Sequence, residues 1–166
     1  EIQQTIKVMG GEDWELWLQA LDEADLLADN CKTTAYTYVG KELTWPIYGQ
    51  ATIGKAKEDL DRAAAAIVKT KASKNVQAYV SSLKALVTQA SSAIPVMPLY
   101  ISLIYKVMKE EGTHQGCIEQ IYDLFADKLT QVQPETDELG RLYMNNKETN
   151  DATQAKIKAL WDQVTQ

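Results

Sequence analysis

The chain has 166 residues, 45% of them hydrophobic and 24% charged, and this composition is typical of one soluble globular domain. A formal net charge of -6 argues against a nucleic-acid-binding surface, because phosphate binding depends on clustered Lys and Arg. The longest mainly apolar stretch, residues 93–105, contains prolines and is far shorter than the roughly 20 residues of a membrane span. We therefore expect no transmembrane segment.

The cysteines and the histidine give little sign of special chemistry. Cys31 and Cys117 lie far apart and form no CxxC pair, which favours two buried reduced thiols over a disulfide or a reactive thiol. Reduced thiols fit a cytoplasmic location. The single histidine, His114, has no nearby ligands at metal-binding spacing, so we expect a loop or helix-start residue and no metal site.

Helix and strand patterns alternate in the first half of the chain. Apolar residues at helical intervals predict a helix over residues 12–28. A stretch rich in β-branched and aromatic residues, 32–40, predicts a strand that stops at a glycine. A second helical pattern begins at residue 54, and residues 76–87 read as a second strand. This order predicts a βαβ unit with parallel strands.

The second half of the chain is mainly helical. Residues 99–109 and 115–129 predict two helices, and the second of these would use Ile118, Ile121, Tyr122, Phe125 and Leu129 as its apolar face. Residues 134–150 predict a loop with a short extended piece at 140–144. A closing helix is expected over residues 152–164.

These elements predict an α/β fold that is part of a doubly wound, Rossmann-type parallel sheet with helices. Two strands alone would leave exposed sheet edges, and the chain has no GxGxxG motif to cradle dinucleotide phosphates. We therefore expect an N-terminal nucleotide-binding half to be missing from this sequence.

A tyrosine and a lysine, Tyr48 and Lys57, follow the first predicted strand with a Tyr-x8-Lys spacing. That spacing alone is uninformative because both residues are common. The chain also contains VMGGEDWELW, TQASSAIPVMPLYISLIYKVMKE, GTHQGCIEQIY and ALWDQVT. Together these segments resemble the trans-2-enoyl-ACP and trans-2-enoyl-CoA reductases of the extended short-chain dehydrogenase type, and the resemblance spans essentially the whole chain.

The resemblance implies that residues 1–166 are the catalytic and substrate-binding portion of a single Rossmann-type reductase domain. It implies reduction of the trans-2 double bond of enoyl-ACP or enoyl-CoA with NADH in fatty-acid synthesis, by a protein that is monomeric at full length. Two alternatives stay open. One is an incomplete, non-catalytic α/β fragment that binds acyl groups or a partner, and the other is reduction of a different carbonyl substrate by the same pair.

The chemistry of this reaction accounts for the pair. Hydride addition to the β-carbon of an unsaturated thioester puts negative charge on the carbonyl oxygen. The phenol of Tyr48, with an ordinary pKa of ~10, can hydrogen-bond that oxygen, and the ammonium group of Lys57 favours phenolate character. The resemblance implies that Lys57 also holds the ribose hydroxyls of the cofactor. The alternative for Tyr48 is a half-buried structural tyrosine.

Helix geometry restricts the chain between these two residues. At about 100° per residue, Tyr48 and Lys57 would lie on opposite faces of a continuous helix. Gly49 and Gly54 allow Tyr48 to lie in a loop and Lys57 in the following helix. Lys55 would share a face with Tyr48 in a continuous helix, but the family resemblance favours Lys57, and we expect Lys55 to be a surface charge.

Two further residues are substrate-site candidates. Tyr38 resembles the upstream tyrosine that lines the acyl pocket and can contact the thioester, and strand packing is its alternative. Thr88 follows the second strand and resembles the family threonine near nicotinamide and substrate, so it is a candidate for both cofactor and substrate binding; a polar strand cap is its alternative. An apolar acyl wall and ordinary core packing are equally compatible with Ile94, Pro95, Met97 and Leu99.

The remaining conspicuous residues have structural interpretations. We expect core packing for the aromatic residues Trp14, Trp17, Trp45 and Tyr36. We expect the carboxylates Glu58, Asp59 and Asp61 to form the solvated face of a helix.

Overall fold

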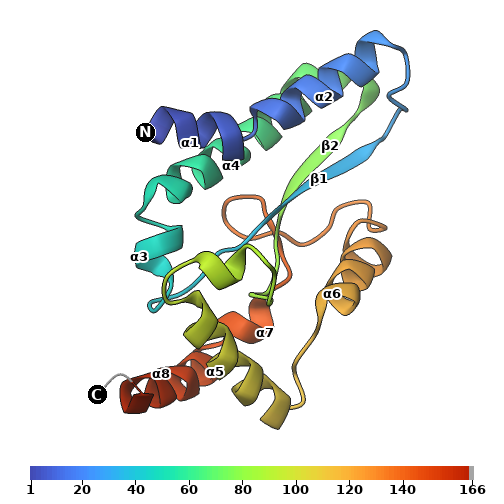
Figure 1. The fold of residues 1–166 in the computed structure, drawn as a ribbon. Coiled ribbons are helices and arrows are strands. Elements are labelled where there is room, and N and C mark those ends of the chain that lie inside the picture. Colours follow the sequence, from blue (N-terminus) through green and yellow to red (C-terminus); the bar gives the residue numbers. More distant parts are fainter. Residues whose placement is uncertain (165–166) are drawn as a thin grey trace.

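The computed structural model describes residues 1–164, and these contain three parallel strands in the order β1-β2-β3, of which Figure 1 shows β1 and β2 side by side. Strand β1 (Lys32–Thr37) pairs with β2 (Gln77–Ser82), which pairs with the short β3 (Leu142–Tyr143). Helix α4 (Thr52–Thr70) connects β1 to β2. The predicted α/β class and βαβ unit are therefore confirmed, and the predicted extended piece near residue 142 is a third strand.

The helices form two groups. Helices α1 (Ile2–Met9), α2 (Glu12–Glu23) and α4 lie together along one side of the β1–β2 pair (Figure 1). Helices α5 (Met97–Glu110) and α8 (Asp151–Val164) pack on each other at the carboxyl end of the strands. The shorter elements are α3 (Trp45–Tyr48), α6 (Cys117–Asp123), α7 (Asn146–Thr149), a π-helical turn at Leu124–Lys128 and 3-10 turns at Ala72–Lys74 and Ser91–Ala93.

The register of the sheet explains where β2 ends. The paired residues run from Lys32 opposite Gln77 to Thr37 opposite Ser82. One further backbone bond joins Leu83 N to Thr37 O at 2.9 Å, and β1 then ends. Residues 84–87 pair with no strand, so the predicted strand over 76–87 is too long.

The buried apolar residues form separate clusters. Helices α2 and α4 bury Leu18 and Ile67 with Val76 and Ala78. The larger cluster surrounds α5, which contributes most of its fully buried residues, and it also includes Tyr48. Tyr48 is therefore held by the main core of the second helix group.

Two predicted helices are wrong in extent or orientation. Helix α2 stops at Glu23 instead of 28, because Asp25 adopts a left-handed backbone conformation with φ of 54°. Helix α6 starts at Cys117 and gives way to the π-helical turn. Its predicted apolar face is wrong, since Ile118 is 82% exposed and Tyr122 is 69% exposed, whereas Gln120 and Leu124 are buried. Helix α1 has no buried residue and is not predicted.

Several expected core aromatics are at the surface. On α2 the stripe through Trp14 and Leu18 faces the core, and Trp17, beside that stripe, is 68% exposed. Trp45 is 47% exposed. Tyr36 is also exposed, because Thr33 and Thr37 face the helices and strand alternation turns Tyr36 to the other face.

The cysteines differ from the prediction of two buried thiols. Both are free, but Cys117 is exposed at the start of α6 and Cys31 is partly buried. Within residues 1–164, no helix is both long and apolar enough to cross a membrane.

Candidate active site

Tyr48 is the last residue of α3, a single helical turn whose second residue is Pro46. Three residues separate it from α4. The prediction that no continuous helix joins Tyr48 to Lys57 is therefore confirmed. The tyrosine ends a short helix and does not lie in a loop. A Cβ atom at Gly54 would collide with the carbonyl oxygen of Gly49. The absence of a side chain at Gly54 thus lets α4 begin directly beside Tyr48.

Lys57 lies close to Tyr48. Its Nζ is 5.4 Å from the centroid of the Tyr48 ring and donates a hydrogen bond to Thr37 Oγ1 at 2.7 Å. Lys55 instead makes an exposed ion pair with Glu58 at 2.8 Å, which confirms that Lys55 is a surface charge. The structure therefore brings Lys57, and not Lys55, to the tyrosine.

Burial dominates the electrostatics of this pair. It lowers the pKa of Lys57 to about 8; the positive charge of Arg141 acts in the same direction, and Asp61 opposes it. Burial also raises the pKa of Tyr48 above its ordinary value. At neutral pH the tyrosine is therefore a neutral phenol that can donate a hydrogen bond, and most Lys57 side chains carry a charge.

Two carboxylates of α4 have specific partners. Arg141 donates to both carboxylate oxygens of Asp61, with Nε to Oδ1 at 2.9 Å. Asp59 pairs with Arg62 and accepts the backbone N–H of Gly11 at 2.9 Å. Only Glu58, with a side chain that is 62% exposed, fits the predicted solvated face. The prediction is wrong for Asp59 and Asp61, because each also binds a group that is distant in sequence, Gly11 for Asp59 and Arg141 for Asp61.

Tyr38 packs against Tyr48. The two ring centroids are 4.9 Å apart and the ring planes meet at 77°, an edge-to-face arrangement. The Tyr38 hydroxyl donates to Glu148 Oε1 at 2.8 Å. Burial, followed by the charge of Glu148, raises the pKa of Tyr38 far above its ordinary value. Tyr38 is therefore a neutral phenol whose hydrogen is already bonded.

A small cavity of about 100 Å³ joins these side chains. Tyr38, Tyr48 and Lys57 all contribute to its wall, so the structure brings three of the four predicted site residues together. The cationic groups of Lys57 and Arg141 beside a buried phenol are the kind of arrangement that binds a carbonyl oxygen. The remaining lining residues are Val39, Gly40, Trp45, Gly49, Gly54 and Glu58.

Thr88 is the predicted site residue that does not line this cavity. It is exposed, and its Oγ1 accepts the backbone N–H of Ser91 at 3.1 Å. Ser91 Oγ in turn accepts the backbone N–H of Thr88 at 2.8 Å. This reciprocal pair matches the polar-cap alternative, and the role of Thr88 in cofactor or substrate binding stays a prediction.

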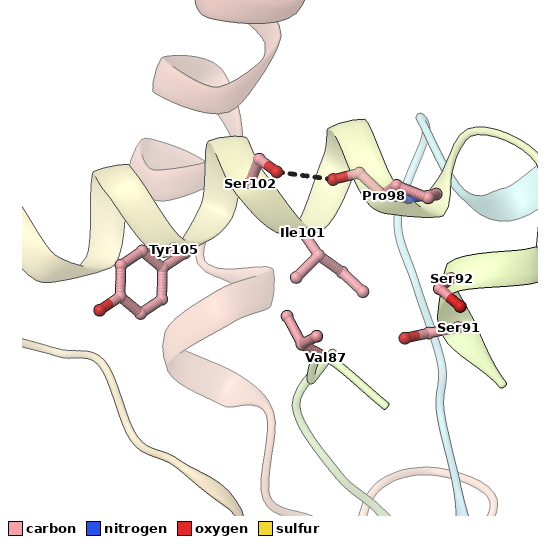
Figure 2. Close-up of a pocket in the computed structure, with 7 residues that line it drawn as sticks. All are labelled: Val87, Ser91, Ser92, Pro98, Ile101, Ser102 and Tyr105. Carbon is pink, nitrogen blue, oxygen red and sulfur yellow. Dashed lines mark hydrogen bonds between the residues drawn. The ribbon is translucent and has the colours of Figure 1, made fainter. Parts of the chain in front are cut away.

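A larger hollow of about 460 Å³ lies along α5, between that helix and the turn after β2. In Figure 2, Ile101 and Val87 point toward one another across it, and Tyr105 lies at one end of the helix segment. Ser91, Ser92, Pro98 and Ser102 complete the lining. The hollow is mainly apolar and shares no lining residue with the Tyr48 cavity.

The predicted acyl wall lies mostly in the core. Met97 is 2% exposed, and Ile94 and Leu99 pack on the same cluster. Their observed contacts favour the core-packing alternative, and an acyl-binding role for them stays a prediction.

Sequence reasoning missed two polar partners of the site. Thr37 accepts a hydrogen bond from Lys57, and its place in the predicted strand over 32–40, shortly before the Tyr-x8-Lys segment, could have suggested it. Glu148 accepts the hydroxyl of Tyr38 although the two are 110 residues apart. It lies in a stretch predicted as loop, and nothing in the local sequence distinguishes it from a surface acid.

Comparisons with known proteins agree on one family. Residues 1–130 match the family model described as the trans-2-enoyl-CoA reductase catalytic region. An enoyl-acyl-carrier-protein reductase (NADH) of Pseudoalteromonas atlantica is 81% identical over 100% of this chain, which covers 42% of that protein. The reductase of the same name from Idiomarina loihiensis is 72% identical, with the same coverage. The chain thus spans about two fifths of the length of these curated relatives.

Solved structures give the same result. The trans-2-enoyl-CoA reductase of Clostridium acetobutulicum in complex with NADH matches with a TM-score of 0.94 and 41% identity, over 98% of this chain and 42% of that chain. The Treponema denticola trans-2-enoyl-CoA reductase in complex with NAD matches with a TM-score of 0.93 and 44% identity, over 98% of this chain and 41% of that chain.

Proposed function

The chain belongs to the trans-2-enoyl-CoA reductase family, and on this premise we propose that it supplies the catalytic residues of an NADH-dependent enoyl-thioester reductase. The substrate is the trans-2 double bond of an enoyl chain carried by acyl carrier protein or coenzyme A, as in fatty-acid synthesis. The observation that carries the proposal is the pairing of the buried Tyr48 phenol with Lys57 Nζ, 5.4 Å from the ring centroid. The residues 1–166 act as part of one reductase domain; residues 165 and 166 lie outside the described residues.

Tyr48 is the proposed catalytic acid or oxyanion-binding group. Addition of hydride at the β-carbon makes the thioester carbonyl an enolate, and the phenol O–H donates to the enolate oxygen. Because burial raises the pKa of Tyr48, the proton stays on the phenol in the resting state. Burial also removes competing water, so the hydrogen bond to the developing charge strengthens.

Lys57 is the proposed electrostatic partner. Its positive charge lowers the energy of negative charge on the Tyr48 oxygen while the proton is shared with substrate. The hydrogen bond to Thr37 keeps the ammonium group beside the ring. On the basis of the family resemblance alone, Tyr38 remains a proposed lining residue of the acyl pocket, and Thr88 a proposed contact of cofactor and substrate.

The residues of this chain fit part of an NADH site. The Lys57 ammonium has three N–H donors, of which one bonds Thr37, so two remain for cofactor ribose hydroxyls. When bound, NADH supplies the hydride. The cavity of about 100 Å³ has room for a small polar group beside Tyr48 and not for a whole dinucleotide, so we propose that other parts of a longer protein hold the rest of the cofactor.

The hollow along α5 is the proposed place for an apolar acyl chain. Its volume of about 460 Å³ is within the range of small-ligand pockets, and such pockets are mainly apolar. In this proposal Ser102→Trp, which fills the hollow from an exposed position, reduces turnover of long enoyl thioesters and spares crotonyl-CoA. Equal effects on both chain lengths would place the acyl chain elsewhere.

The function is tested with the full-length protein, NADH and crotonyl-CoA, with loss of NADH absorbance followed and products identified. Formation of butyryl-CoA is the expected result. Acetoacetyl-CoA serves as the comparison substrate, because NADH oxidation with it alone would indicate reduction of a carbonyl group instead. A folded protein that binds NADH and oxidises it with neither substrate would favour the alternative of a non-catalytic acyl- or partner-binding module.

A further inference from the structure

A buried carboxylate lies behind the Tyr38–Tyr48 pair. The Glu148 side chain, on the single-turn helix α7, is 0% exposed. Tyr38 donates its hydroxyl to Oε1 at 2.8 Å, and Tyr100 donates to the same oxygen at 2.9 Å. The backbone N–H of Ala85 donates to Oε2 at 2.7 Å. Both oxygens are therefore occupied by hydrogen bonds from three donors.

This carboxylate ties together segments that are distant in sequence. Its three donors come from the chain after β1, the chain after β2 and helix α5. Gln154 on α8 also bonds the backbone oxygen of Glu148 at 2.8 Å. Glu148 thus connects the segment that carries Tyr38 to the helix group that packs around Tyr48.

An uncompensated buried carboxylate is strongly unfavourable. Burial raises the pKa of Glu148, while hydrogen bonds from Ala85, Tyr38 and Tyr100 and the charge of Lys84 act against that rise. The hydrogen bonds therefore hold in place a group that burial alone disfavours.

The hydroxyl of Tyr38 bonds Glu148, whereas the ring of Tyr38 packs against Tyr48. A phenol has one hydrogen to donate, and that of Tyr38 is bonded to Glu148. The ring meets Tyr48 edge-to-face with centroids 4.9 Å apart. Tyr38 therefore links Glu148 to the Tyr48 ring. Because its hydroxyl hydrogen is already bonded to Glu148, Tyr38 has no donor left for a substrate carbonyl.

We propose that Glu148 is a positioning residue, which holds Tyr38 by its hydroxyl so that the Tyr38 ring fixes the direction of the Tyr48 phenol. The inference rests on the proposed function, because it concerns the same Tyr48. It assigns Tyr38 an effect that passes through Tyr48 instead of direct contact with the thioester.

The test compares Glu148→Gln, Tyr38→Phe and Tyr100→Phe in the full-length protein. Tyr38→Phe and Tyr100→Phe each remove one phenol donor from the same carboxylate oxygen, so they are matched in chemistry. Only Tyr38→Phe frees a ring that packs on Tyr48. Glu148→Gln and Tyr38→Phe are expected to lower kcat with crotonyl-CoA roughly 10- to 100-fold, with little change in KM, because a small misplacement of a reacting group reduces the rate by that order.

Two controls separate positioning from loss of stability. Tyr100→Phe is expected to keep kcat near the wild-type value, although thermal unfolding shows a destabilisation like that of Tyr38→Phe. The double variant Glu148→Gln with Tyr38→Phe is expected to be no slower than either single variant, because both act through one contact. Additive losses, or a loss in Tyr38→Phe with wild-type kcat in Glu148→Gln, would overturn the proposal.

A second readout does not depend on activity. In protein with ¹³C-labelled tyrosine, the NMR ring signal of Tyr48 is expected to shift in Glu148→Gln and in Tyr38→Phe and to stay in place in Tyr100→Phe. If Glu148→Gln does not fold, the kcat values and Tyr48 ring signals of Tyr38→Phe and Tyr100→Phe test the positioning role. A wild-type protein that leaves crotonyl-CoA unreduced contradicts the proposed function, whereas an unmoved Tyr48 signal in Tyr38→Phe contradicts the positioning role.

Discussion

The ammonium nitrogen of Lys57 lies 5.4 Å from the centroid of the Tyr48 ring and donates a hydrogen bond to Thr37 Oγ1 at 2.7 Å. Thr37 is the last residue of β1, and Lys57 lies in the second turn of α4. The hydrogen bond therefore joins the end of strand β1 to helix α4. As a result, a positive charge is held next to a buried phenol.

The first prediction compares two lysines of α4. Lys57→Gln is expected to lower kcat/KM with crotonyl-CoA by roughly 100-fold or more, because the charge that stabilises the transition state is lost. Lys55→Gln is the matched control, since Lys55 only pairs with the exposed Glu58, and we expect activity near the wild-type value. Steady-state kinetics of the full-length variants check this. Equal losses of kcat/KM in the two variants would show that Lys57 is not the electrostatic partner of Tyr48.

The second prediction concerns the pH dependence of turnover. Burial lowers the pKa of Lys57 to about 8, and the charged form is the one that assists Tyr48. Turnover should therefore fall as pH rises through about 8. Thr37→Val removes the acceptor of the ammonium hydrogen bond, which lowers the pKa further, so the fall should move to lower pH.

Thr34→Val is the control for this experiment. Thr34 lies on the same strand, but its hydroxyl bonds Ser81 at 2.6 Å. The pH at which turnover falls should match the wild type in Thr34→Val. An unchanged pH profile in Thr37→Val would show that the Thr37 hydrogen bond does not stabilise the charged lysine.

The third prediction is that stability changes with pH in the opposite direction to activity. The folded pKa of Lys57 is about 8, below its ordinary 10.5, so the unfolded chain binds more protons between these two values. The contribution of Lys57 to the free energy of unfolding should therefore rise as pH increases through that window. The free energy of unfolding, measured by chemical denaturation at several pH values in that window, should rise more steeply with pH in the wild type than in Lys57→Gln. Equal dependence on pH in the two proteins would contradict the lowered pKa.

The fourth prediction concerns Asp61 and Arg141, a partly buried pair with side chains 22% and 13% exposed. Asp61→Asn is expected to lower the free energy of unfolding by about 1 to 3 kcal/mol, because hydrogen bonds between charged groups are lost. Glu42→Gln, which breaks the exposed pair with Lys158, should change it by less than about 1 kcal/mol. Denaturation curves measure both, and equal effects would contradict the structural role of Asp61.

The βαβ unit could be predicted because its signals are local. The β-branched and aromatic composition of β1 and the apolar spacing in α4 mark a strand and a helix without knowledge of their partners. The exposed face of α6 could not be predicted in this way. Periodicity shows that Ile118 and Tyr122 share a face, but not whether anything covers that face.

The polar contacts of the site depend on distant residues. The break between Tyr48 and Lys57 follows from helix geometry and two glycines, and the family resemblance distinguishes Lys57 from Lys55. Glu148 is different, because Tyr38 is 110 residues away from it and Ala85 is 63 residues away. No local pattern encodes such contacts, so its burial becomes visible only in the folded chain.

In the proposed mechanism the Tyr48 hydroxyl donates a hydrogen bond to the thioester oxygen as negative charge develops on it. The most direct measurement is turnover of crotonyl-CoA by full-length Tyr48→Phe, with NADH binding measured in parallel by fluorescence. We expect kcat to fall roughly 100- to 1000-fold with NADH affinity close to that of the wild type. Wild-type turnover by a folded Tyr48→Phe protein that binds NADH would contradict this mechanism.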